Sequence, residues 1–115
     1  MIFLSNWKLF FCGGFESLRS KLPYVYIYNF LYESLTRKTD MIVPRSHHAL
    51  EIDNDKVFAF GGKSNYDHLD RCEKYDIESD SWLEIENLPE VKCDINSTKH
   101  KNRIYIVNGD DNCMF

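Results

Sequence analysis

The tetrapeptide Gly61-Gly62-Lys63-Ser64 is the first candidate for chemistry, because it matches the end of a phosphate-binding loop. In such loops backbone amides and a lysine hold the phosphates of a nucleotide. The full pattern requires a glycine five residues before Gly62, where this chain has Val57. It also requires a helix to follow, whereas residues 65–68 are typical of a loop. We therefore expect no nucleotide site and no cofactor.

Two other groups could hold a metal ion. Asp53-Asn54-Asp55 begins like a calcium-binding loop, but Phe58 replaces the glycine at position 6 and Ser64 replaces the glutamate at position 12. A hairpin turn explains the acidic triplet better. His47 and His48 are adjacent, so on a strand they point to opposite faces and cannot bind one ion together. We expect His48 to be a hydrogen-bonded residue of the core.

The cysteines give no metal or disulfide pattern. They are Cys12, Cys72, Cys93 and Cys113, and none forms a C-x-x-C pair. We expect free, mostly buried thiols. No Ser-His-Asp set or paired-carboxylate site can be assembled either, so we predict no catalytic residues, no metal and no enzymatic activity.

Composition limits the partners. The 115 residues carry a net charge of −4 and are 43% hydrophobic and 15% aromatic. Residues 1–45 contain six Lys and Arg against three Asp and Glu. Residues 46–115 contain eight Lys and Arg against fifteen Asp and Glu. This acidity disfavours nucleic acid. No apolar stretch approaches the roughly 18 residues of a membrane span, and no secretory leader is visible. We expect a soluble cytoplasmic protein.

The chain repeats itself, which is a signature of repeat architectures. Leu9–Cys12 followed by Gly13-Gly14 recurs as Val57–Phe60 followed by Gly61-Gly62, at an offset of 48 residues. Ile104–Val107 followed by Asn108-Gly109 is a third copy, 47 residues further on. Downstream, Tyr28 corresponds to Tyr75 and Leu35 to Trp82.

Each period predicts strands. Four segments show either alternating apolar and polar residues or a short apolar run, and polar turns separate them. These segments are residues 48–52, 57–60, 71–75 and 82–85. Residues 24–32 of the first copy also fit a strand. No segment has the apolar stripe of a helix. Four antiparallel strands per period form the blade of a β-propeller, so the predicted fold class is all-β.

These residues resemble the kelch repeat, in which four hydrophobic residues precede a diglycine, and a Tyr and a Trp follow with six residues between them. The middle copy matches this pattern at every position, and the segment Pro44-Arg45-Ser46-His47-His48 that precedes it also resembles the family. The first copy has Leu35 in place of Trp, and the third has Asn108 in place of a glycine. The structural motif residues implied by the resemblance are Gly13, Gly14, Tyr28, Gly61, Gly62, Tyr75, Trp82 and Gly109.

The resemblance implies an incomplete propeller of about two and a half kelch blades, where four to eight usually close the ring. The predicted units are a partial blade at 1–44, a complete blade at 45–91 and the start of a third at 92–115. By the resemblance, residues 48–52 form the innermost strand and 82–86 the outermost. The chain is then a piece of a longer protein, a truncated reading frame, or a half that pairs with another chain. We expect open blade faces holding some of Phe58, Tyr75 and Trp82 to drive self-association.

The function that the resemblance implies is a protein-protein interaction scaffold. Its binding loops are predicted at 15–22, 42–46, 63–69 and 89–94. The candidate contact residues are Arg45, Lys63, Asn65, Tyr66 and His68. A narrower hypothesis is the substrate-recognition part of a ubiquitin-ligase adaptor, which needs a BTB or F-box domain beyond these residues. Two rival hypotheses stay open. One is a fragment of a propeller enzyme, resembling galactose oxidase with its copper or acting on sialic acid, and the second is a degenerating gene fragment without function.

Overall fold

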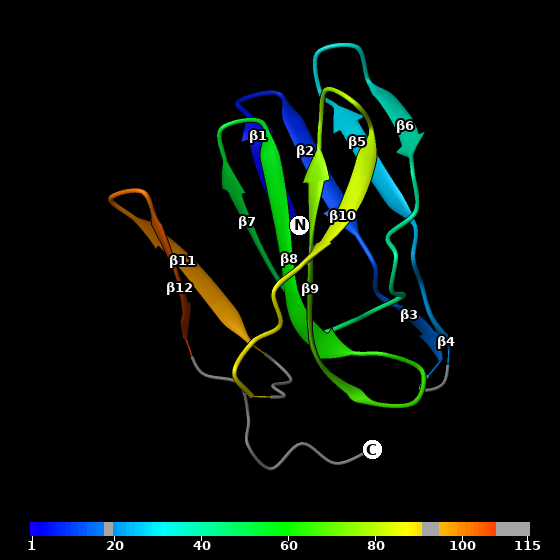
Figure 1. Cartoon of the computed structure of the whole chain (residues 1–115). Coiled ribbons are helices and arrows are strands. Elements are labelled where there is room, and N and C mark those ends of the chain that lie inside the picture. The colour runs from blue at the N-terminus through cyan, green and yellow to red at the C-terminus, as the bar shows by residue number, and fades with distance from the viewer. Residues whose placement is uncertain (18–19, 91–94, 108–115) are drawn as a thin grey trace.

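The computed structural model describes residues 1–17, 20–90 and 95–107, and over these ranges the chain is all-β (Figure 1). The first sheet contains β1 (Ile2–Ser5), β2 (Lys8–Cys12), β5 (Val25–Asn29) and β6 (Ser34–Lys38), antiparallel and in that order. A small hairpin, β3 (Phe15–Ser17) and β4 (Ser20–Lys21), lies between β2 and β5 in the chain. Within the described ranges there is no helix long and apolar enough to cross a membrane.

The second sheet repeats the first. It contains β7 (Ala49–Asp53), β8 (Lys56–Lys63), β9 (His68–Asp76) and β10 (Ser81–Ile85), and each strand pairs with the next along the chain. A further hairpin of β11 (Asn96–His100) and β12 (Arg103–Val107) follows. Two four-stranded antiparallel sheets and a hairpin confirm the predicted fold class of an incomplete propeller.

The diglycine of the second sheet lies inside a strand and does not end it. β8 was expected to stop at Phe60, but it continues through both glycines to Lys63, with an irregular register between Phe60 and Gly62. Gly62 has φ +92°, and a Cβ there would clash with the carbonyl oxygen of Ser46. Only glycine fits because the backbone of the segment before β7 passes so close to this position.

Alternation along the strands places apolar side chains between the sheets. Phe10 and Val25 of the first sheet pack against Val57 and Tyr75 of the second, and all four are fully buried. The rings of Phe10 and Tyr75 have their centroids 5.4 Å apart, a spacing typical of favourable aromatic pairs. Neighbouring sheets therefore cover one another.

The opposite face of the second sheet packs on the β11–β12 hairpin. Phe60 and Cys72 form this second cluster with Ile95, and Ile104 and Ile106 of β12 pack against it. Each repeat thus buries an apolar face only where the next repeat covers it, as in other repeat proteins.

The first strands of the three units lie next to one another. β1 contacts β7, and β7 contacts β11. The hydroxyl of Ser97 on β11 donates to the carbonyl oxygen of Leu50 on β7 at 3.1 Å, and Lys99 forms an ion pair with Asp53 at 2.8 Å. The strand order within each sheet then runs outward from this centre, in the order that the family resemblance implied.

Of the three aromatic residues expected on open blade faces, the structure contradicts the expectation for Tyr75. Tyr75 is fully buried, and Phe58 and Trp82 are partly buried under neighbouring units. An exposed apolar surface lies on the first sheet, on the face turned away from the second sheet. We call it the open face; its residues are Phe3, Leu9, Phe11, Tyr26, Tyr28 and Leu35.

An irregularity in β1 contributes to this face. The register shifts between Phe3 and Ser5, so Phe3, and not Leu4, pairs with Leu9. Phe3 consequently lies on the open face with 60% of its surface exposed. The open face corresponds by repeat to the face of the second sheet that packs on the first sheet, because Tyr28 and Leu35 correspond to Tyr75 and Trp82.

The linker between the two sheets, residues 39–48, is hydrogen-bonded on both sides. On the first-sheet side, the amide of Met41 donates to Pro23 O and the amide of Gly14 donates to Arg45 O, both at 2.9 Å. On the second-sheet side, Ser46 and Lys63 exchange two backbone hydrogen bonds, at 2.9 and 2.8 Å. The linker therefore fixes how the two sheets meet.

Candidate functional site

Loops from both sheets gather at one end of the molecule, opposite the tight hairpin turns (Figure 1). The ring of Phe15 stacks on His47 with centroids 5.5 Å apart. The amide of Lys21 donates to Asn65 Oδ1 at 2.5 Å, joining the β3–β4 hairpin to the β8–β9 loop. We call this region the mouth surface; its residues are Phe15, Lys21, Val43, Pro44, His47 and residues 64–71.

The mouth surface contains parts of three of the four loops predicted from the sequence. These are 15–22, 42–46 and 63–69, although residues 18 and 19 lie outside the described ranges. In the fourth predicted loop, 89–94, residues 91–94 are also outside the described residues. Loops that are distant in sequence thus form one surface on a rigid scaffold, where binding residues are most often found.

A pocket of about 750 Å³ opens in the mouth surface. Val43 and Pro44 of the linker form one wall, and residues 64–71 form the rest. Three predicted contact residues line it: Asn65, Tyr66 and His68. Its size is within the range of ligand pockets in proteins.

A compact turn positions Tyr66 at the pocket. The hydroxyl oxygen of Ser64 accepts from the amide of Asp67 at 3.0 Å and from that of Tyr66 at 3.3 Å. The amide of Ser64 in turn donates to Asp67 O at 2.7 Å. Serine commonly stabilises turns in this way. Tyr66 projects from the turn with 85% of its surface exposed.

Arg45, a predicted contact residue, has no exposed surface. Its Nη2 donates to Glu73 Oε2 at 2.7 Å, and its Nη1 donates to the carbonyl oxygens of Gly61 and Arg71 at 3.0 and 2.9 Å. The same carboxylate accepts from the amides of Ile42 and Val43. Arg45 therefore holds the linker to the second sheet and offers nothing to a partner. Lys63, the fifth predicted contact, is half-buried beside Ser46 and does not line the pocket.

His48 lies beneath the mouth surface against Cys12, with its Nε2 3.6 Å from the sulfur. Its other ring nitrogen, Nδ1, is buried and has no hydrogen-bond partner among the described residues. Burial raises the pKa of the Cys12 thiol to about 12 and, with the nearby charge of Arg45, lowers the pKa of His48 to about 3. Both groups are neutral near pH 7, so they do not form a reactive thiolate–imidazolium pair.

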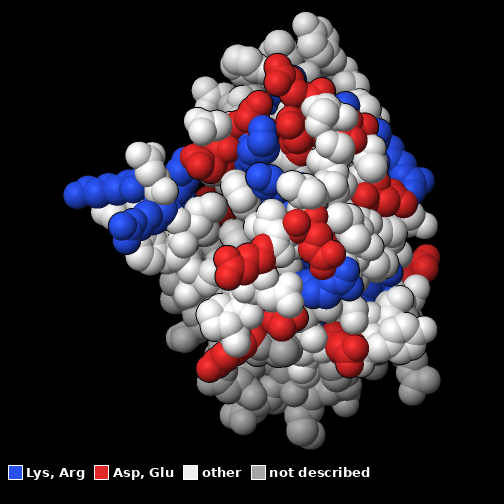
Figure 2. Space-filling model, viewed as in Figure 1, with Lys and Arg blue, Asp and Glu red and all other residues white. Residues whose placement is uncertain are grey.

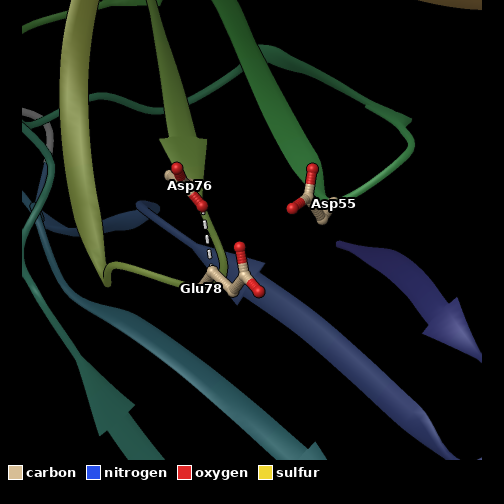
Figure 3. A group of neighbouring side chains, drawn as sticks. All are labelled: Asp55, Asp76 and Glu78. Carbon is tan, nitrogen blue, oxygen red and sulfur yellow. Dashed lines mark hydrogen bonds between the residues drawn. The ribbon is translucent and has the colours of Figure 1, made fainter.

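Three carboxylates gather at the opposite end of the second sheet, contributed by Asp55, Asp76 and Glu78 (Figure 3). Their nearest oxygens lie within 4.8 Å of one another, and among the described residues this is the only such group of possible metal ligands. Lys56 Nζ already lies 3.2 Å from Asp55 and 3.4 Å from Asp76. The lysine offsets part of the negative charge in a largely exposed position, which is an ordinary arrangement for surface acids.

Val43, Pro44, Asp67 and Asp70 line the pocket but were not predicted as contact residues. The two acids could have been noticed, because they lie three residues apart in or beside a loop that was already a binding candidate. Val43 and Pro44 lie in the predicted binding loop 42–46, but nothing in the sequence singles them out within it. Only the path of the linker across the second sheet brings them to the pocket.

Comparison with known proteins agrees with the repeat pattern. Residues 44–89 match the family model described as the kelch motif. Beta-scruin of Limulus polyphemus is 35% identical over 64% of the chain and 8% of its own length. Kelch-like protein 7 of Mus musculus is 37% identical over 58% of the chain and 12% of its own length. Kelch-like protein 26 of Danio rerio is 28% identical over 89% of the chain and 18% of its own length.

The chain thus spans less than a fifth of the length of each of these relatives. The match nonetheless covers the whole second sheet, with its diglycine, Tyr75 and Trp82. Together with the two repeated sheets, it shows that the chain belongs to the kelch-repeat family.

Proposed function

We propose that this chain is part of a non-catalytic protein-binding scaffold and that a partner protein contacts it at the mouth surface. The observation that carries the proposal is Tyr66, 85% exposed at the rim of the pocket on a loop fixed by hydrogen bonds. The turn fixes the backbone of Tyr66, and tyrosine is enriched among residues that dominate binding energy.

The surface charge supports a protein partner over nucleic acid. Acidic and basic side chains interleave over the sheets in Figure 2, and basic side chains project mainly from the β11–β12 hairpin. That hairpin contains Lys99, Lys101 and Arg103. Nucleic-acid binding requires a continuous basic face, which the view in Figure 2 does not have.

A photo-crosslinking experiment on the full chain tests the proposal. A crosslinking amino acid at position 66 should capture a protein, which is then purified and titrated against Tyr66→Ala and Tyr32→Ala. Tyr32 is a matched control, 77% exposed on the β5–β6 turn at the other end of the sheet. We expect Tyr66→Ala to weaken binding about tenfold and Tyr32→Ala to leave it unchanged. Equal affinities would reject the mouth surface as the binding site.

The open face supports a second interaction, self-association. Phe3 and Leu35 are 60% and 57% exposed there, and the rings of Phe11 and Tyr26 stack beside them with centroids 5.6 Å apart. Exposed apolar patches of this kind usually mark association surfaces. We propose that the open face packs on another blade, against the face that corresponds to the Phe10 and Val25 face of the first sheet. We also propose that the blades span residues 1–44, 45–91 and 92–115.

A further inference from the structure

We propose that the pocket of the mouth surface binds an arginine side chain of the partner protein. This inference rests on the protein-binding role proposed above and names the chemistry of that partner. Three features carry it: uncompensated negative charge, an exposed aromatic ring, and an apolar wall.

The negative charge comes from Asp67 and Asp70, which both line the pocket. Neither carboxylate has a hydrogen bond or an ion pair with any residue of the described ranges 1–17, 20–90 and 95–107. Asp67 takes part in the Ser64 turn only through its backbone. The two charges are therefore available to a ligand.

The two arginines nearest the pocket are each paired with a glutamate. Arg71 also lines it, but its Nε donates to Glu84 Oε1 at 2.6 Å. The Arg71 hydrogen bond also lowers the pKa of Glu84, so that carboxylate stays charged and the pair persists at neutral pH. Arg45, beneath the linker, is paired with Glu73. The pocket consequently attracts a cation.

The shape of the pocket suits a long side chain that ends in a flat cation. Partly buried Pro44, with the small exposed parts of Val43 and Leu69, provides apolar surface for a methylene chain. The ring of Tyr66 provides an exposed aromatic face on which a guanidinium can stack. Arginine combines both properties and forms bidentate hydrogen bonds with carboxylates, which lysine does not.

Titration of the full ¹⁵N-labelled chain with two short peptides tests the inference. One is acetyl-Gly-Gly-Arg-Gly-Gly-amide; the other has citrulline, which is nearly isosteric with arginine but uncharged. We expect the arginine peptide to bind about fivefold or more tightly, and to shift the amide signals of residues 64–71. Asp67→Asn and Asp70→Asn should each weaken its binding about threefold to fivefold, near the upper end of the range for exposed charge pairs.

Glu86→Gln is the matched control, because it removes one exposed negative charge on the β10 side, outside the pocket lining. It should leave the affinity within about twofold. Equal binding of the citrulline peptide, or Asn variants no different from Glu86→Gln, would overturn the inference. Circular dichroism and thermal melts of each variant establish that it remains folded.

Failure of this inference can be told apart from failure of the proposed function. If the crosslinked partner loses affinity with Tyr66→Ala but not with Asp67→Asn or Asp70→Asn, the mouth surface binds protein without recognising arginine. If Tyr66→Ala also has no effect, both proposals are wrong.

Discussion

Arg45 Nη2 lies 2.7 Å from Glu73 Oε2, and both side chains are fully enclosed between the linker and the second sheet. The carboxylate accepts two linker amides, and the guanidinium donates to two strand carbonyls. These hydrogen bonds offset much of the cost of removing both charges from water, a condition that buried ion pairs must meet.

Breaking this pair from either side should be strongly destabilising. Arg45→Met leaves the Glu73 carboxylate buried without its cation, and we expect a loss of about 3–5 kcal/mol in the free energy of unfolding. Glu73→Gln should also be destabilising. The double variant should lose at least about 1 kcal/mol less than the sum of the two single losses, because neither charge is then left alone. Urea denaturation of the full chain measures all three, and additive losses would contradict the coupling.

Two glycine substitutions separate backbone strain from steric contact. Gly14 has φ +99° but open space where a methyl group would lie, so Gly14→Ala should cost only about 1–2 kcal/mol of conformational strain. Gly62→Ala adds a clash with Ser46 O and a contact of 2.9 Å with the backbone nitrogen of His48. We expect it to be more destabilising than Gly14→Ala by at least about 2 kcal/mol. Thermal or urea unfolding compares them, and equal losses would show that the linker moves away freely.

His48 should make the protein less stable as the pH falls below neutrality. Its pKa is about 3 in the folded chain, against 6.5 for an exposed histidine side chain. Between these values the unfolded chain binds a proton that the folded chain does not, so stability decreases as the pH is lowered through 6.5. We expect a loss of about 1–2 kcal/mol between pH 7 and pH 5.

His48→Gln is the comparison, because it removes the titrating group but keeps polar atoms at the same position. Its stability should change less between pH 7 and pH 5 than that of the unmodified chain. Unfolding curves at several pH values measure both slopes. The same slope in both proteins would assign the pH dependence to other histidines.

Leu35→Lys should reduce self-association, because it places a charge on the open face. Leu83→Lys is the matched control: Leu83 is 59% exposed on β10, and Leu35 is 57% exposed on β6. Sedimentation velocity over a range of concentrations should show fewer associated species for Leu35→Lys and no change for Leu83→Lys. If both variants associate as the unmodified chain does, the open face is not the contact.

Most of the fold could be predicted from the sequence because the repeat is a local signal. The strands β7 and β10 were predicted within a residue at each end, since alternation and polar turns mark them. The continuation of β8 through Gly61-Gly62 could not be predicted, because glycines usually interrupt strands. The pairing of Gly62 with Leu69 and of Lys63 with His68 extends this one.

The candidate site was predicted less completely, because burial depends on contacts between distant residues. Arginine is seldom buried without a partner, and nothing near Arg45 in the sequence indicates that Glu73 lies beside it. The open face depends similarly on the register shift at Phe3, a single irregularity of β1. Tyr66 could be singled out from the sequence because its loop follows the diglycine motif directly, and it lines the pocket.

The linker that is hydrogen-bonded to both sheets has a consequence for how recognition can diversify in such a chain. Since Gly14, Arg45, Ser46 and Lys63 lock the spacing of neighbouring loops, a new specificity cannot arise by tilting one sheet against the next. It has to come from exchanging side chains on loops whose positions stay constant. We therefore expect natural sequence variation at loop positions such as 65–67, and little variation at the residues that fix the angle between repeats.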